Sequence, residues 1–97
     1  MLRGIIPALV TPLNEDESVR VDTVTRLIKE LSAQGADGFY IGGATGEGLA
    51  LRAEERKILT EAAVAAAAED KGVIVQVAST NYADMLMLAR HAEEKGA

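Results

Sequence analysis

Apolar residues follow two different patterns along the chain, and these patterns alternate three times. Short runs at 5–10, 38–41 and 73–77 are apolar without polar alternation, which is typical of parallel strands covered on both faces. Each short run is followed by a longer stretch with helical periodicity. The distance from one short run to the next fits one β/α unit, so the pattern predicts three such units.

The three longer stretches carry signals for helix ends. The first predicted helix begins near Asp22 and ends at Gly35, the second spans about 53–69, and the third begins near Asn81 and ends at Gly96. Asp and Asn are good N-terminal caps, and glycine is common just after a helix. The predicted inward-facing residues are Val24, Leu27, Ile28, Leu31, Ile58, Leu59, Ala62, Ala65, Ala66, Met85, Leu88, Ala89 and Ala92.

This order of elements predicts an α/β chain with parallel strands: three units of a barrel or of an open wound sheet. The motif "KGA" (95–97) repeats the helix-to-strand link seen in "QGADG" (34–38), so we expect a fourth strand beyond residue 97. Residues 1–97 would then be a single partial domain, truncated before that strand. Its unpaired strand edges predict self-association of the chain.

Composition and charge argue against several function classes. The net charge of −5 and the few aromatic residues disfavour a nucleic-acid partner. The absence of cysteine excludes a disulfide framework and a thiolate zinc site. No segment reaches membrane-spanning length, and Pro7 and the acidic run at 15–17 do not fit a signal peptide. We therefore expect a cytoplasmic protein without a membrane partner.

The candidate chemistry lies in the glycine-rich stretch "IGGATGEGLA" (41–50). It lacks the lysine of a phosphate-binding P-loop and the glycine spacing of a dinucleotide site, and Glu47 would repel a dianion. A small carboxylate fits better, because backbone N–H groups around Ala44 and Thr45, together with the Thr45 hydroxyl, can converge in a tight glycine turn. The alternative is that the glycines only let the strand pass closely under a helix.

Three segments resemble a known family: "GIIPALVTPL" (4–13), "GFYIGGATGEG" (38–48) and "EER" (54–56). They resemble the pyruvate-dependent class I aldolases grouped with N-acetylneuraminate lyase and dihydrodipicolinate synthase, in order and over the whole chain. Tyr40 favours the neuraminate lyase branch. A dihydrodipicolinate synthase-like enzyme or another 2-keto-3-deoxy acid aldolase is the alternative, and a non-catalytic β/α scaffold is the alternative of another class.

The resemblance implies that the chain forms the first three β/α units of a (β/α)8 TIM barrel. It implies that a lysine forms a Schiff base with pyruvate or another 2-oxo acid, without a cofactor, in a homo-oligomer that is commonly tetrameric. The substrate carboxylate would bind at Ala44 and Thr45, Ala8 would line the pocket, and Tyr40 would support the site. The supporting residues of the turn would be Gly43, Gly46 and Glu47.

The chain departs from the family pattern in two ways. Ala44 stands where the family usually has Ser or Thr, which removes one hydrogen-bond donor and puts a proton relay in doubt. The Schiff-base lysine and the proton-transferring tyrosine belong to later strands, beyond residue 97, so the chain alone is predicted to be inactive. The lysines of the chain fall on predicted helices or their ends, beside acidic residues: Lys29, Lys57, Lys71 and Lys95.

A few other polar residues could bind a metal or lie near the substrate, but the signals are weaker. His91 and Glu94 are spaced like a ligand pair on a helix, but a zinc site needs three or four ligands. We therefore predict that His91 lies on a solvated helix surface and that there is no metal site. Ser79 and Thr80 follow the third predicted strand, where a modest role near the substrate is possible.

Overall fold

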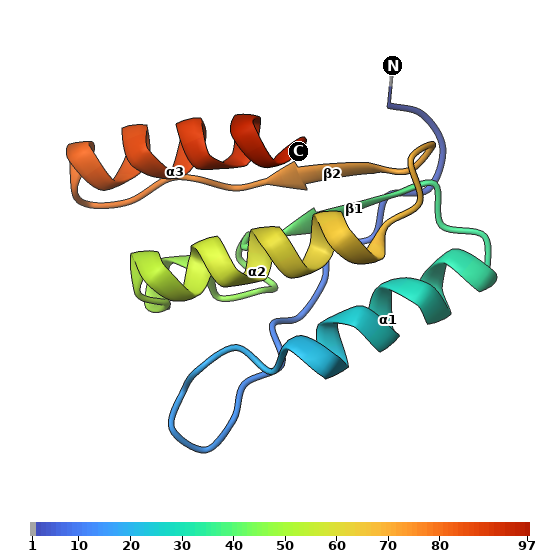
Figure 1. Cartoon of the computed structure of the whole chain (residues 1–97), viewed down its shortest axis with the longest axis horizontal. Helices are drawn as coiled ribbons and strands as arrows, with labels where there is room; N and C mark the ends of the chain where they lie inside the picture. Colours follow the sequence, from blue (N-terminus) through green and yellow to red (C-terminus); the bar gives the residue numbers. More distant parts are fainter. Residues whose placement is uncertain (1) are drawn as a thin grey trace.

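The computed structural model describes residues 2–97, which form a parallel sheet covered on one side by helices (Figure 1). Helix α2 packs between α1 and α3, and it also contacts both strands. The helices therefore follow one another across the sheet in chain order. The elements are α1 (Val21–Ala33), β1 (Gly38–Ile41), the short 3-10 helix η1 (Gly48–Ala50), α2 (Ala53–Ala66), β2 (Gly72–Val75) and α3 (Tyr82–Lys95).

The two strands pair in parallel from Gly38 opposite Gly72 to Ile41 opposite Val75. Among the described residues, the other edge of β2 has no strand partner, and self-association there stays a prediction. The predicted parallel direction is confirmed. The strand predicted at 73–77 is shorter than expected, although the Gln76 N–H still donates to the Ile41 carbonyl at 3.1 Å.

The strand predicted at 5–10 is present only as an extended segment beside β1. It forms one parallel bridge, between Ala8 and Tyr40, in which Tyr40 N–H donates to Pro7 O and Leu9 N–H donates to Tyr40 O. The next rung would need an N–H at residue 7 to reach the Gly38 carbonyl, and proline has none. The prediction of a full strand was therefore wrong, and Pro7 explains why.

The helix predictions hold with corrections at the ends. Asn81 caps α3 by accepting the Asp84 N–H at 3.0 Å, and Gly96 follows it with a φ of 95°. Helix α1 has Arg20 at its N-cap, without a side-chain hydrogen bond. The predicted N-cap, Asp22, lies inside the helix instead, so that prediction was wrong. Helix α2 ends at Ala66 rather than near residue 69, because the next residue is already extended.

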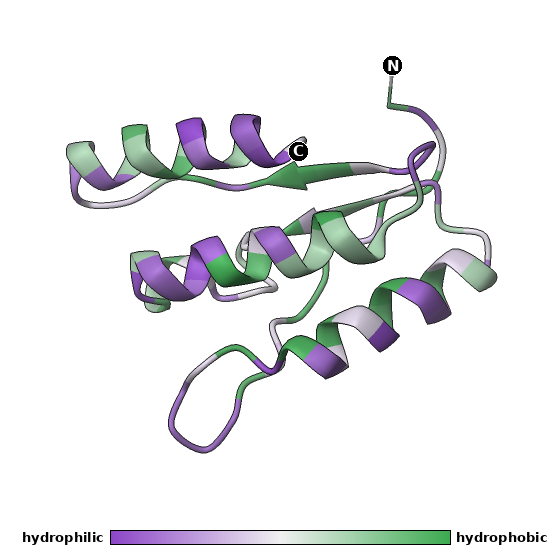
Figure 2. Ribbon diagram, viewed as in Figure 1, coloured by the Kyte–Doolittle hydropathy of each residue, from purple (hydrophilic) through white to green (hydrophobic). Residues whose placement is uncertain are grey.

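Successive strand residues point to opposite faces, so the sheet has a covered face and an open face. Leu9, Phe39, Ile41 and Val73 are buried in one core with the inner sides of α1 and α2. Figure 2 shows both strands as hydrophobic, whereas the helices are mixed. The buried helix residues of this core are Val24, Ile28, Leu59, Ala62 and Ala63.

Some predicted inward-facing residues point outward instead. Ile58 is 37% exposed, and Ala65 and Ala89 are also exposed. Helix α2 is rotated so that Leu59 and Ala63 face the sheet. That rotation places other residues of its first turn in the interior, as described below.

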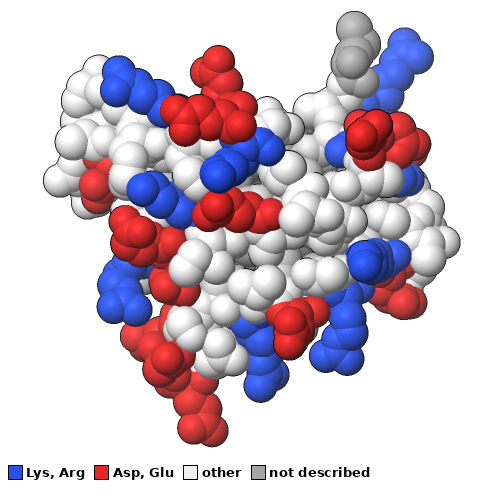
Figure 3. Space-filling view, in the orientation of Figure 1, with Lys and Arg blue, Asp and Glu red and all other residues white. Residues whose placement is uncertain are grey.

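On the open face, Ala8, Tyr40 and Ile74 form one row across the sheet. Ala8 is exposed, Tyr40 is half-buried and Ile74 is 36% exposed. The three residues of this row are uncharged. Acidic side chains gather over the loop at 13–19 that precedes α1 (Figure 3). Within residues 2–97, the helices are too short or too polar to cross a membrane.

Candidate functional site

The glycine-rich turn lies at the C-terminal end of β1, and close contacts hold its shape. A Cβ on Gly48 would lie 1.8 Å from the Gly42 carbonyl oxygen, and one on Gly46 would lie 2.9 Å from the Leu9 carbonyl oxygen. A Cβ on Gly43 would lie 2.8 Å from the Tyr40 ring. These glycines are therefore needed because the backbone and the ring approach closely; the contacts are with the turn itself, with segment 5–10 and with Tyr40, not with a helix as the packing alternative expected.

The same turn leaves several neighbouring N–H groups without an acceptor among residues 2–97, including those of Ala44 and Thr45. Glu47 N–H donates to Ala44 O and Gly48 N–H donates to Gly43 O, each at 3.1 Å. No hydrogen bond within residues 2–97 uses the N–H of Ala44 or Thr45, and both residues are exposed. Because an amide donor rarely stays without an acceptor, this position is suited to an incoming oxygen. Packing and anion binding are thus compatible roles of one turn.

The extended segment 5–10 and the residues that follow it support the turn. The Thr11 hydroxyl donates to the Gly46 carbonyl at 2.6 Å. Ala8 lies beside Tyr40 on the open face, and the Tyr40 ring covers Gly43. The structure therefore brings the predicted residues Ala8, Tyr40, Gly43 and Gly46 into one neighbourhood.

A hollow of about 310 Å³ adjoins the turn, and Ala44 is part of its wall. Thr45 and Ala8 do not line it. Glu47 does line it, is exposed, and has the left-handed φ of 53°. Its carboxylate makes no hydrogen bond within residues 2–97, so its charge disfavours anions in this hollow, and a dianion most strongly. The lining residues are Gly43, Ala44, Glu47, Gly48, Leu49, Ala50 and Gln76.

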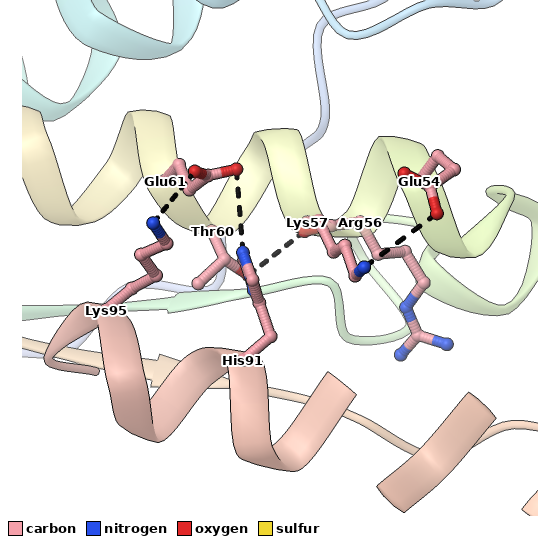
Figure 4. A network of polar contacts seen from close by, with 7 residues as sticks. All are labelled: Glu54, Arg56, Lys57, Thr60, Glu61, His91 and Lys95. Carbon is pink, nitrogen blue, oxygen red and sulfur yellow. Dashed lines mark hydrogen bonds and ion pairs between the residues drawn. The ribbon is translucent and has the colours of Figure 1, made fainter. Parts of the chain in front are cut away.

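Two buried charged residues in the first turn of α2 hold loops at this edge of the sheet. Glu55 is 8% exposed and accepts the Val19 N–H at 2.7 Å. Arg56 is 5% exposed and donates to the Gln76 carbonyl at 2.6 Å and to the Ala78 carbonyl at 2.7 Å. Burial lowers the pKa of Arg56. In Figure 4 its guanidinium extends away from the ion pair between Glu54 and Lys57.

The sequence analysis used Glu55 and Arg56 only as part of the "EER" (54–56) resemblance and predicted no buried contact for either, although a signal was present. Leu59 follows Glu55 by four residues, and Ala63 follows Arg56 by seven. Extending the inward stripe of α2 back by one turn therefore reaches both charged residues. A charged residue on an inward-facing helical position needs a partner, which here is a backbone group of a neighbouring loop.

His91 contradicts the predicted solvated surface. Its side chain is only 13% exposed, and its Nε2 lies 3.5 Å from Glu61 of α2 (Figure 4). Lys95 contacts the other Glu61 oxygen at 3.3 Å. The packing of α3 on α2 therefore covers His91, which the sequence of α3 alone does not reveal. Across residues 2–97, no three or more His, Cys, Asp or Glu side chains group as metal ligands.

The four lysines lie away from the glycine-rich turn. Lys29 is exposed on α1, and Lys57 pairs with Glu54 on α2 at 3.8 Å. Lys71 precedes β2 and donates to the Ala36 carbonyl at 2.7 Å, at the opposite edge of the sheet. Lys95 is on α3. None of the four lysines therefore places an amine at the C-terminal ends of the strands.

Comparison with known proteins matches the whole chain. Residues 1–97 match the model of the dihydrodipicolinate synthetase family. The 4-hydroxy-tetrahydrodipicolinate synthase of Bartonella bacilliformis is 37% identical over 97 residues, which are 100% of this chain and 33% of that protein.

Two solved structures show the same likeness. The N-acetylneuraminate lyase of Proteus mirabilis has a TM-score of 0.89 and 40% identity, covering 95% of this chain and 31% of that one. YagE, a prophage protein of E. coli K12 from the dihydrodipicolinic acid synthase family, was solved with pyruvate. It has a TM-score of 0.90 and 32% identity, covering 97% of this chain and 32% of that one.

The chain thus spans about a third of the length of the relatives it matches. The solved relatives are TIM-barrel enzymes, which confirms the predicted fold class. Relatives carry both lyase and synthase names. The chain therefore belongs to the dihydrodipicolinate synthetase family of aldolases.

Proposed function

We propose that the full-length protein is a Schiff-base aldolase acting on pyruvate-derived 2-oxo acids, and that this chain supplies its carboxylate-binding turn at Ala44 and Thr45. The names of the relatives support the reaction class, and the pyruvate bound to YagE supports the substrate class. The catalytic lysine and the proton-transferring tyrosine lie outside residues 1–97. The chain alone is accordingly inactive.

The observation that carries the proposal is the pair of free N–H groups at Ala44 and Thr45. Two adjacent donors match the two oxygens of one carboxylate, and hydrogen bonds to a charged acceptor are the stronger kind. The glycine contacts hold the donors in place before substrate arrives, so little ordering is needed on binding. Ala8 and Tyr40 form the neighbouring wall on the open face of the sheet.

This binding step prepares the chemistry by fixing the ketone relative to the lysine. The lysine amine adds to the ketone and releases water, which yields an iminium. When the substrate carbon–carbon bond breaks, its electron pair moves toward the iminium nitrogen and an aldehyde leaves. Ala44 has no hydroxyl, so residue 44 contributes no proton-transferring group in this scheme.

The finer proposal is a neuraminate lyase-like enzyme, and Tyr40 supports it. The likeness to the Bartonella synthase supports the alternative, a dihydrodipicolinate synthase-like enzyme. Release of pyruvate from N-acetylneuraminate would distinguish the first activity from formation of 4-hydroxy-tetrahydrodipicolinate. The proposal includes a cytoplasmic location, as the sequence analysis expects, and a homo-tetramer, as the family resemblance implies.

Borohydride trapping of pyruvate on the full-length protein tests the reaction class. We expect a covalent adduct by mass spectrometry, and no adduct on the 97-residue chain. Thr45→Val should raise the half-saturating pyruvate concentration about tenfold, because the carboxylate loses a hydroxyl donor. Thr25→Val on α1 is the matched control and should change nothing. Absence of an adduct on the full-length protein at any pyruvate concentration would reject the proposed function.

A further inference from the structure

Gln76 reaches the carboxylate-binding turn from a different strand. It follows β2 directly, and its N–H continues the pairing by donating to Ile41 O at 3.1 Å. The residue is half-buried and lines the 310 Å³ hollow together with Ala44. The other lining residues all come from segment 43–50. Gln76 therefore brings the loop after β2 to the wall of the hollow.

Gln76 is also the lining residue whose side chain can donate a hydrogen bond. Apart from Glu47, the remaining lining residues are glycine or apolar. A carboxylate only accepts hydrogen bonds and repels an anionic ligand, whereas a glutamine amide has two N–H donors. Of the described side chains around this hollow, Gln76 is thus the one that favours a bound carboxylate.

The orientation of the Gln76 amide follows from its contact with Ala78. The Ala78 N–H donates to Gln76 Oε1, and an N–H group requires an oxygen as its acceptor here. The amide nitrogen is then turned away from Ala78. No hydrogen bond within residues 2–97 uses Gln76 Nε2. Its N–H groups are available to a ligand.

Arg56 holds the backbone of the segment that carries the Gln76 side chain. Its two terminal nitrogens donate to the carbonyls of Gln76 and Ala78, at 2.6 and 2.7 Å. The planar guanidinium holds both carbonyls in one geometry, which a lysine ammonium would not reproduce. Arg56 therefore sets where the Gln76 side chain begins and where its acceptor contact lies.

We propose that Gln76 is a substrate-binding residue, whose Nε2 donates to the carboxylate of the bound 2-oxo acid, and that Arg56 is its positioning residue. The inference rests on the proposed function, because it concerns the same carboxylate. It assigns to Gln76 the side-chain donor that is missing at Ala44. Gln76 and Ala44 line one hollow, so a donor in the loop after β2 replaces a donor on the turn.

The test uses pyruvate trapping by borohydride on the full-length protein. Gln76→Leu removes the donor and should raise the half-saturating pyruvate concentration about tenfold, with the maximal adduct unchanged. Gln76→Glu keeps the side-chain size and an acceptor for Ala78 N–H. It adds a repelling charge, so its half-saturating concentration should rise further. Gln34→Leu, at the end of α1, is the matched control and should leave the value unchanged.

Arg56→Lys tests the positioning role. It should raise the half-saturating concentration severalfold in the unsubstituted protein and have no added effect in the Gln76→Leu background. Equal effects in both backgrounds would reject positioning through Gln76. An adduct with an unchanged half-saturating concentration in both Gln76 variants would overturn this inference and leave the proposed function intact. No adduct on the unsubstituted protein would instead reject the proposed function itself.

Discussion

The loops that follow β1 and β2 meet at one edge of the sheet but are held by opposite means. The turn after β1 keeps its shape because Gly43, Gly46 and Gly48 have no side chains where other atoms approach. The loop after β2 keeps its shape because the long side chain of Arg56 holds its carbonyls. The loop after β1 is thus sensitive to atoms added to its glycines, and the loop after β2 is sensitive to removal of the Arg56 side chain.

The opposite edge of the sheet sharpens this contrast. There, Asp37 accepts the Ile5 N–H at 2.8 Å and Lys71 donates to the Ala36 carbonyl at 2.7 Å. These contacts join neighbouring segments and satisfy their backbone groups. At the C-terminal edge, by contrast, the N–H groups of Ala44 and Thr45 have no acceptor among residues 2–97. The edge that leaves donors free is the one where TIM-barrel enzymes carry their active sites.

Adding one methyl group to the first loop should have the largest effect. Gly48→Ala places a Cβ 1.8 Å from the Gly42 carbonyl oxygen, a backbone atom that cannot move away alone. We expect a loss of about 3 kcal/mol in the free energy of unfolding of the full-length protein, measured in urea. Pyruvate trapping should fall below detection, because the turn that carries the free N–H groups is displaced.

Gly35→Ala is the control for this substitution. Gly35 has a φ of 105° and no atom within 4 Å of its added Cβ, so only backbone strain is introduced. This variant should lose about 1 kcal/mol of unfolding free energy and keep its half-saturating pyruvate concentration. If Gly48→Ala bound pyruvate normally, the close contact would not be what shapes the site.

Removing the arginine should have the next largest effect, through the second loop. Arg56→Met leaves the carbonyls of Gln76 and Ala78 without their donor, which should cost about 2 kcal/mol of unfolding free energy. The half-saturating pyruvate concentration should also rise. Arg52→Met provides the control, because Arg52 is exposed and its side chain makes no hydrogen bond within residues 2–97. Equal losses in both variants would show that the loop does not depend on Arg56.

The same contrast explains what the sequence could predict. A glycine turn after an apolar run is a local feature, so the turn and its free N–H groups around Ala44 and Thr45 could be anticipated. The proline that interrupts segment 5–10 was equally local, and its missing N–H should have shortened the predicted strand. Three helices and the parallel direction of the strands followed from periodicity and spacing.

The second loop could not be predicted in this way. Arg56 lies 20 and 22 residues before its acceptors, and Glu55 lies 36 residues after its donor, Val19. Such contacts depend on how far α2 is rotated on the sheet, which alanine-rich periodicity specifies weakly. His91 is covered for a similar reason, because its partner Glu61 belongs to another helix. Buried charged residues therefore remained hidden where the helix register was ambiguous.

Restoring a hydroxyl at residue 44 should have the smallest effect and is the most direct comparison of the two loops. Ala44→Ser adds a donor to a carboxylate that, under the proposal, two N–H groups, the Thr45 hydroxyl and Gln76 already bind. We expect about a threefold lower half-saturating pyruvate concentration in the trapping assay, equivalent to about 0.6 kcal/mol. Ala83→Ser, exposed on α3, is the control and should change nothing.

The decisive measurement repeats Ala44→Ser in the Gln76→Leu background. If the two residues donate to one carboxylate, the serine replaces the lost amide donor, and its benefit should grow to about tenfold. An unchanged threefold benefit would mean that the two side chains act independently, and the loop after β2 would then not belong to the carboxylate site. A benefit greater than threefold would show that a donor at residue 44 can substitute for the donor at residue 76, because both residues border the same hollow.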